Sequence, residues 1–96
     1  MIRIHRSKPL VYVGSARVSL TPDEHLLVTT LGMMDNRLVP HALLLEVMRE
    51  HPVPIPADRE ALMLRMSRLK KKLGKSYLTC RRQLGYQLTG EVQFVG

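Results

Sequence analysis

The sequence is poor in cysteine, in aromatic residues and in acidic residues. Its 96 residues include one cysteine, one phenylalanine and no tryptophan. Cys80 has no partner for a disulfide within the chain, which excludes a disulfide-stapled secreted scaffold and favours a reducing compartment. No apolar run reaches the length of a signal-peptide core or of a membrane span. The sequence therefore predicts a cytoplasmic protein without a membrane anchor.

Basic residues outnumber acidic ones. Fifteen Lys and Arg against eight Asp and Glu give a formal net charge of +7 at pH 7. Such a surplus favours an anionic partner, either nucleic acid or an acidic membrane surface. The hydrophobic fraction of 45% is that of an ordinary globular protein. The length suits one domain, residues 1–96, with no room for a deep active-site cavity.

Residues that could carry catalysis or hold a metal are scattered along the chain. The four histidines have neither a partner four residues away nor a nearby pair of cysteines, as a zinc site would need; they are His5, His25, His41 and His51. The chain shows no nucleophile triad, no paired carboxylates with a cleft and no glycine-rich phosphate loop. We therefore expect neither an enzyme nor a bound cofactor or metal.

The N-terminal third predicts a small antiparallel sheet followed by a helix. Three short runs rich in β-branched and apolar residues are separated by turn-forming residues, at 2–5, 9–14 and 16–20. In the stretch LTPDE that follows, Thr21 can cap a helix, Pro22 suits its first position and Glu24 can complete a capping box. A first helix is therefore expected over residues 22–34.

The rest of the chain predicts two more helices and a hairpin. Residues 40–50 begin with a proline and carry apolar residues at helical spacing, which indicates a second helix. The alternating prolines of HPVPIPAD favour an extended loop. Asp58 can then cap a third helix that ends before Gly74. Its apolar stripe is Leu62, Met66, Leu69 and Leu73, and a hairpin and a tail strand are expected after it.

Positive charge concentrates on the third helix and on the hairpin. At 100° per residue, Arg65, Arg68 and Lys72 share one side of the helix, beside the apolar stripe. Arg59 and Lys70 lie on the opposite flank, and Arg81 and Arg82 add a second basic element in the hairpin. A basic run at a helix end can also be a solvated face that offsets the helix dipole. Two adjacent basic elements favour nucleic-acid binding, with the helix in a major groove.

The order of these elements resembles the OmpR/PhoB-type winged-helix effector domain of bacterial response regulators. Three motifs carry the resemblance, which extends over nearly the whole chain: LTPDE at 20–24, MSRLKKKL at 66–73 and TCRRQLGY at 79–86. The resemblance implies an α+β fold, a winged helix-turn-helix with a small N-terminal antiparallel sheet, three helices and a C-terminal β-hairpin wing. The implied function is sequence-specific regulation of transcription on double-stranded DNA. A recognition helix of about 58–73 would enter the major groove, and a wing of about 77–88 would contact the backbone or minor groove.

Carried over by position, the resemblance places DNA contacts on both basic elements. Arg68 and Lys70 fall at contact positions of the recognition helix, Arg65 falls on the same face, and Arg82 falls at the wing arginine. Further candidates of lower rank are Arg59, Lys72, Cys80 and Arg81. The sequence departs from the family at three places, where contacts are not carried over: Pro40 replaces a capping serine, a tryptophan late in the second helix has no counterpart, and Gln83 replaces the first wing glycine.

Alternatives remain open for the partner. Leu43 and Val47 lie off the core stripe of the second helix, so the domain could instead be an interaction module that modulates a regulator or RNA polymerase without reading bases. RNA or an anionic membrane would also attract the positive charge. By resemblance, the loop at 50–57 is a place for contact with RNA polymerase, and tandem DNA half-sites would imply a dimer. No receiver domain precedes the motifs in these 96 residues, so we expect no phosphorylation switch within them. The chain would be a stand-alone regulator or part of a larger one.

Overall fold

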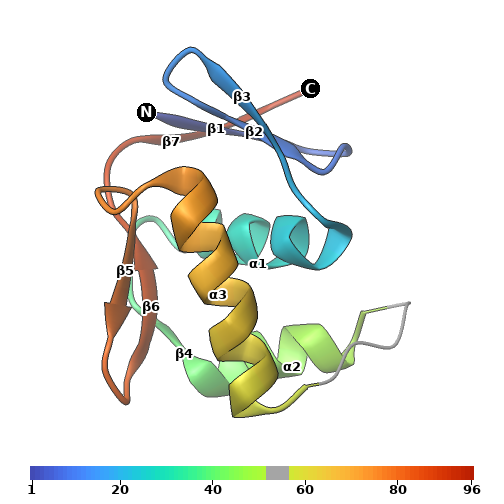
Figure 1. Ribbon diagram of the computed structural model, residues 1–96, viewed down its shortest axis with the longest axis vertical. Coiled ribbons are helices and arrows are strands. Elements are labelled where there is room, and N and C mark those ends of the chain that lie inside the picture. The colour runs from blue at the N-terminus through green and yellow to red at the C-terminus, as the bar shows by residue number, and fades with distance from the viewer. Residues whose placement is uncertain (52–56) are drawn as a thin grey trace.

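A four-stranded sheet forms one end of the molecule and packs on the helices below it (Figure 1). The fold is that of a computed structural model, which describes residues 1–51 and 57–96. The sheet has the order β3-β2-β1-β7 and consists of β1 (Ile2–His5), β2 (Leu10–Val13), β3 (Ala16–Ser19) and β7 (Val92–Val95). The three N-terminal strands are antiparallel, as predicted. The tail strand β7 pairs parallel to β1, a partner that the local sequence does not indicate.

Helix α1 (Pro22–Gly32) begins with the predicted capping box. The backbone N–H of Glu24 donates to Oγ1 of Thr21 at 3.3 Å, and the N–H of Thr21 donates to Oε1 of Glu24 at 2.8 Å. Both donors belong to the helix end, where no intrahelical acceptor exists. The helix is two residues shorter than predicted at its C-terminus, where Asp35 and Asn36 adopt positive φ.

Helices α2 (His41–Arg49) and α3 (Arg59–Leu73) complete the helix-turn-helix. Asp58 accepts a hydrogen bond from the N–H of Ala61 at 2.8 Å, and Gly74 ends α3 at a φ of 100°, both as predicted. The prediction that Pro40 begins the second helix is wrong by one residue: Pro40 stands at the N-cap position of α2 without a side-chain cap hydrogen bond. It belongs instead to a two-residue strand, β4 (Val39–Pro40), which the sequence did not predict. The predicted proline-bearing loop between the helices falls largely on residues 52–56, outside the described residues.

The wing is the hairpin of β5 (Leu78–Arg81) and β6 (Gly85–Leu88), with β4 added beside β6. Close packing requires a glycine at position 85 in the wing. A Cβ at Gly85 would lie 2.0 Å from the carbonyl oxygen of Val39, because Gly85 pairs with Pro40 across the two strands. The wing is therefore fixed to the segment that leads into α2.

The buried residues connect both sheets and all three helices. The predicted stripe of α3 is buried, with Leu62, Met66, Leu69 and Leu73 at most 2% exposed. These side chains share a cluster with Ile2 and Ile4 of β1, Leu27 and Leu31 of α1, Leu44 of α2 and Leu88 of the wing. The core thus fixes α3 between α1 and the wing, with its opposite side free of packing (Figure 1).

Candidate nucleic-acid interface

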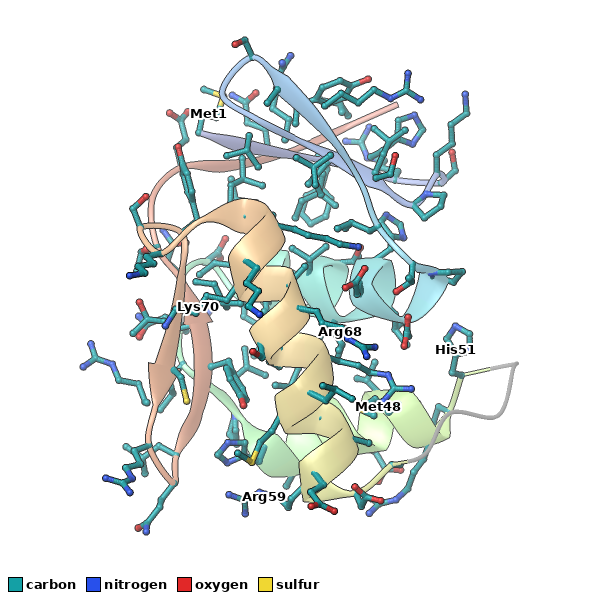
Figure 2. All side chains as sticks on the ribbon, viewed as in Figure 1. Met1, Met48, His51, Arg59, Arg68 and Lys70 are labelled. Atoms are coloured by element: carbon teal, nitrogen blue, oxygen red, sulfur yellow. The ribbon has the colours of Figure 1, made fainter. Side chains whose placement is uncertain are left out.

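The outward side of α3 carries a mixed surface. Leu64, Ser67 and Lys71 are exposed and lie roughly opposite the buried stripe, since they follow one another at i, i+3 and i+7. Arg68 is exposed on one flank of this row, and Lys70 lies on the flank that faces the wing (Figure 2). The C-terminal half of the helix carries most of its cations, whereas the N-terminal half exposes Arg59 and Glu60 together with the apolar Met63 and Leu64.

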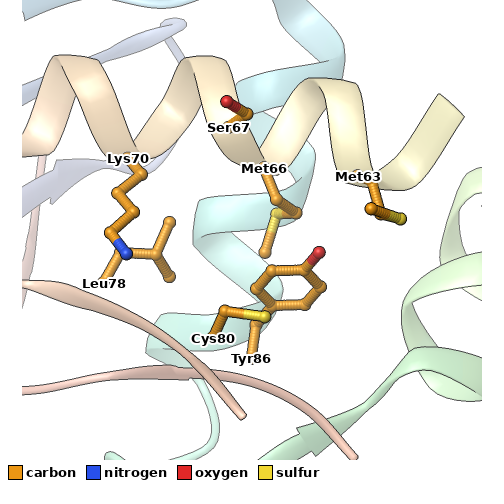
Figure 3. A pocket seen from close by; sticks show the side chains of 7 residues that line it. All are labelled: Met63, Met66, Ser67, Lys70, Leu78, Cys80 and Tyr86. Atoms are coloured by element: carbon orange, nitrogen blue, oxygen red, sulfur yellow. The ribbon is translucent and has the colours of Figure 1, made fainter. Parts of the chain in front are cut away.

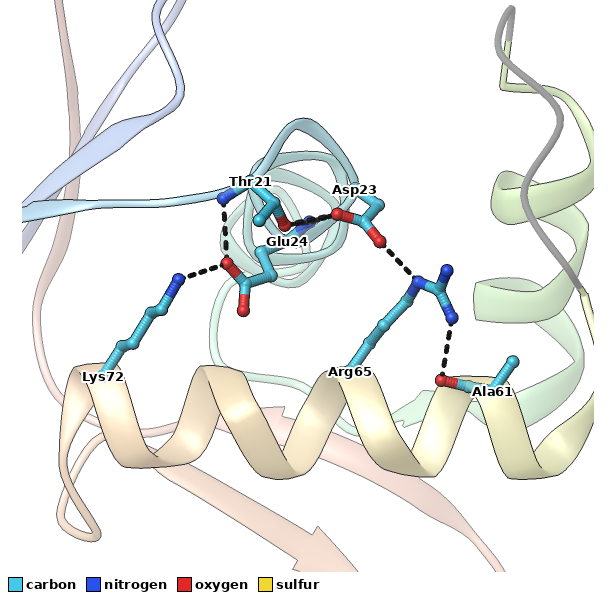
Figure 4. A network of polar contacts seen from close by, with 6 residues as sticks. All are labelled: Thr21, Asp23, Glu24, Ala61, Arg65 and Lys72. Atoms are coloured by element: carbon cyan, nitrogen blue, oxygen red, sulfur yellow. Dashed lines mark hydrogen bonds and ion pairs between the residues drawn. The ribbon is translucent and has the colours of Figure 1, made fainter.

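Two basic side chains of α3 face the N-terminus of α1 (Figure 4). The Nε of Arg65 lies 2.5 Å from Oδ2 of Asp23, and the Nζ of Lys72 lies 2.6 Å from Oε1 of Glu24. Arg65 also donates from Nη1 to the carbonyl of Ala61 at 3.2 Å. The Arg65 side chain is 18% exposed, and the Glu24 side chain is 3% exposed. These contacts are therefore partly shielded from water.

The contacts of Asp23 and Glu24 favour the ionised form of both carboxylates. Burial alone would raise the pKa of Asp23, but hydrogen bonds from Thr21 and Arg65, together with the charge of Arg65, outweigh burial and lower it below its usual range. Burial likewise acts to raise the pKa of Glu24, and the hydrogen bonds from Lys72 and Thr21 reverse the direction. At neutral pH both carboxylates are therefore anions that hold the cations of α3.

This pairing changes the expected exposed face. The helical periodicity grouped Arg65 and Lys72 with Arg68 on one open side of α3. The structure instead turns Arg65 and Lys72 onto Asp23 and Glu24, and only Arg68 of the three has no acidic partner among the described residues. Asp23 and Glu24 directly follow the helix cap in the sequence, and their local pattern indicates a helix start but not the ion pairs with α3.

A groove of about 200 Å³ separates α3 from the wing (Figure 3). Its lining is Met63, Met66, Ser67 and Lys70 from α3, and Leu78, Cys80 and Tyr86 from the wing. Burial raises the pKa of Tyr86, and its contact with Cys80 adds to the rise. Lys70 thus stands at the boundary between helix and wing, and Cys80 is an exposed thiol on the same groove.

Arg59 lies where α2, α3 and the wing meet. The rings of His41 and Tyr86 pack edge to face there, with centroids 5.4 Å apart at 89°. Burial lowers the pKa of His41, and the positive charge of Arg59 lowers it further. Both rings are nearly buried, with His41 8% and Tyr86 6% exposed. The positive charge of Arg59, the first residue of α3, thus acts on the packed rings of His41 and Tyr86.

The wing presents two exposed arginines at its turn. Arg81 ends β5, Arg82 follows it, and both are exposed. The N–H of Leu84 donates to the carbonyl of Arg81 at 2.9 Å and closes the turn, while Gln83 adopts a φ of 64°. In the part of the chain that the structure describes, neither arginine forms an ion pair. The wing turn therefore carries two exposed positive charges.

Solved structures of response regulators share this architecture. The C-terminal domain of the nisin resistance regulator NsrR, a lantibiotic response regulator, is 30% identical over 88% of this chain and 89% of that chain, with a TM-score of 0.74. The chain belongs to the OmpR/PhoB-type winged-helix DNA-binding domains. The expected α+β winged-helix fold is confirmed. Domains of this family are parts of transcription factors and not enzymes.

Two further OmpR/PhoB-type domains match in fold. The DNA-binding domain of the response regulator AdeR, solved in complex with an intercistronic region, is 21% identical and covers 94% of this chain and 95% of that chain, with a TM-score of 0.73. The DNA-binding domain of RstA from Klebsiella pneumoniae, solved in complex with the RstA box, is 21% identical over 82% of this chain and 81% of that chain, with a TM-score of 0.67. No family model matches the chain, and no curated protein matches it either.

The described residues also bear on metal binding and on membrane insertion. No three side chains of His, Cys, Asp or Glu in that part of the chain come together as a metal site would require. None of its helices has the length and apolar character to cross a membrane.

Proposed function

We propose that this domain is a sequence-specific, double-stranded DNA-binding regulator of bacterial transcription that acts in the cytoplasm. The observation that carries the proposal is that, within the described part of the chain, some cations of α3 are paired with carboxylates of α1 and others are not. Arg65 and Lys72 are held by carboxylates, whereas Arg68, Lys70 and Lys71 project from α3 without an acidic partner among the described residues. Unpaired cations on one exposed helix attract a polyanion.

The shape of this surface favours a duplex. A single α-helix fits the major groove of B-DNA, and α3 exposes one long side for that purpose. The wing arginines, Arg81 and Arg82, flank that helix and would contact phosphates or the adjacent minor groove. In this arrangement Arg68 and Lys70 would read or approach base edges, and Arg59 would contact backbone. The AdeR and RstA domains, which share the fold, are both solved with DNA, and this likeness supports the proposal.

Selection from a pool of random duplexes near physiological salt tests the function directly. The bound fraction is sequenced after several rounds of retention by the purified domain. We expect an enriched motif, and a motif repeated about one helical turn apart would indicate tandem half-sites and a dimer on DNA. Retention without enrichment, lost steeply as salt rises, would mean phosphate binding only and would contradict sequence-specific regulation.

A second candidate function follows from one exposed apolar residue on α2. Leu43 is 38% exposed and Val47 is half-buried beside it, so this side of α2 could bind a regulator or RNA polymerase. The loop expected to meet RNA polymerase, residues 50–57, lies mostly outside the described residues. Under this function, Leu43→Asp would abolish capture of purified RNA polymerase while Arg68→Glu would leave it intact. The DNA-binding function predicts that Arg68→Glu abolishes operator binding and Leu43→Asp does not.

A further inference from the structure

The first half of α3 exposes two large apolar side chains. Leu64 is 51% exposed, and its neighbour Met63 is 57% exposed. Neither belongs to the buried stripe, whose members are at most 2% exposed. Leaving two large apolar side chains in water on one helix forgoes the stabilisation that burial gives, which points to a partner that covers them.

The surroundings of Leu64 are cationic on its C-terminal side and acidic on its N-terminal side, where Asp58 and Glu60 line a hollow with Met63 and Leu64. Ser67, Arg68 and Lys71 follow it at i+3, i+4 and i+7, so they lie on the same side of α3. Arg68 and Lys71 have no acidic partner among the described residues. Two neighbouring apolar side chains next to unpaired cations suit a phosphate-lined groove better than they suit a broad apolar protein surface.

The composition of α3 narrows which bases it can recognise. Arg and Lys bind guanine through O6 and N7, and Asn or Gln bind adenine through N6 and N7. The sequence of α3, REALMLRMSRLKKKL, contains no Asn and no Gln. Ser67 can contact either base pair, so the feature that distinguishes an A·T pair for this helix is the one apolar group of the major groove, the C5 methyl of thymine.

We propose that Leu64 is a specificity-determining residue that packs on the C5 methyl of a thymine in the target site. The inference rests on the proposed DNA-binding function and adds the chemistry of one contact to it. Arg65 follows Leu64 directly and precedes Arg68 by about one helical turn. A free guanidinium at Arg65 would therefore compete with Leu64 for the same part of the groove. The ion pair with Asp23 holds the guanidinium of Arg65 at α1 instead. The target site then combines guanines opposite the cationic half of α3 with a thymine opposite Leu64.

Replacement of thymine by deoxyuridine tests the contact, because it removes the methyl and keeps the hydrogen-bonding edge. Each thymine of the selected site is replaced singly, and affinity is measured by fluorescence anisotropy. For the wild-type domain we expect a loss of about three- to fivefold at one thymine, the effect of one methyl group removed from a packed contact. Leu64→Ala should bind the thymine site more weakly and should lose nothing further when that thymine becomes deoxyuridine.

The matched control is Met33→Ala. Met33 is 70% exposed at the C-terminal end of α1, so the change removes a similar apolar side chain outside α3. Met33→Ala should keep the full sensitivity to deoxyuridine. If Leu64→Ala keeps it as well, or if no thymine matters to the wild-type domain, the inference is wrong while sequence-specific binding stands. If selection enriches no sequence at all, the proposed function fails and the inference fails with it.

Discussion

One carboxylate oxygen joins α1 to α3. Oε1 of Glu24 accepts a hydrogen bond from the backbone N–H of Thr21 at 2.8 Å and lies 2.6 Å from Nζ of Lys72. The first contact caps the N-terminus of α1, and the second ties the candidate recognition helix to it. Because Glu24 is 2% exposed, its charge depends on both donors for stabilisation. The orientation of α3 is thereby coupled to the cap of α1.

The change Glu24→Gln removes the charge and keeps an amide oxygen that can still cap Thr21. We expect the free energy of unfolding to fall by about 1–3 kcal/mol, measured by urea denaturation. Breaking a buried ion pair costs more than this, but Lys72 is 36% exposed and water replaces part of the contact. The matched control is Glu46→Gln, whose ion pair with Arg49 is more than half exposed on both sides and should contribute at most about 0.5 kcal/mol. Equal losses in both variants would contradict the role of Glu24.

The stability of the domain should depend on acidic pH through Asp23 and Glu24. Their pKa values in the folded state are lowered from the ordinary values of 3.8 and 4.5, so the unfolded chain binds protons first. The stabilisation is complete above the ordinary values and is lost as pH falls through the lower values of the folded state. We expect the free energy of unfolding to decline below about pH 5 in the wild-type domain. A double variant, Asp23→Asn with Glu24→Gln, should show a flatter decline, and an unchanged slope would remove these two groups as the cause.

Local patterns predicted most of the fold, and the exceptions are contacts between distant segments. The cap at Thr21, the buried stripe of α3 and the stop at Gly74 depend on neighbours in sequence, so spacing alone predicted them. The parallel pairing of β7 with β1 and the short strand β4 depend on segments far apart in the chain. No local pattern encodes these pairings.

In the candidate site, too, local patterns predicted the local features and missed the contacts between distant segments. The positions of Arg68 and Lys70 on two different flanks of α3 follow from helical periodicity, and in the structure Arg68 is exposed while Lys70 is half-buried on the side of the wing. The ion pairs of Arg65 and Lys72 do not follow from periodicity, because they depend on how α1 crosses α3. A helical wheel gives the direction of a side chain and not the charge that it meets there.

Gly85 should tolerate no side chain. In Gly85→Ala the new methyl would lie 2.0 Å from the carbonyl oxygen of Val39, a backbone atom that cannot move without separating β4 from β6. We expect a loss of about 2–4 kcal/mol in the free energy of unfolding, with faster amide exchange in the wing. The control is Gly14→Ala, where a Cβ meets nothing within 4 Å and only the φ of 60° opposes the change, at a cost of about 1 kcal/mol. A loss in Gly85→Ala no larger than in Gly14→Ala would mean that the close approach to β4 is not needed.

Arg68 and Arg65 should separate recognition from stability. Arg68 is exposed without an acidic partner among the described residues, so Arg68→Ala should leave the free energy of unfolding unchanged. It should weaken binding to the selected site by about 1–3 kcal/mol, with a smaller effect on random duplexes. Arg65→Ala should instead destabilise the fold, because it leaves Asp23 without its partner. Equal loss on specific and random DNA would reduce Arg68 to a phosphate contact.

The wing arginines should contribute through charge alone. The slope of log K against log salt concentration is negative, and each lost phosphate contact reduces its magnitude by about 0.9, so replacing both Arg81 and Arg82 by Ala should reduce the magnitude by about 2. The matched control replaces Lys8 and Arg17, which are exposed on the N-terminal sheet and remove the same net charge. If the effect came from net charge, the two double variants would change the slope equally. A change confined to the wing variant would place the phosphate backbone against the hairpin, and an unchanged sequence preference would show that α3 reads the bases without it.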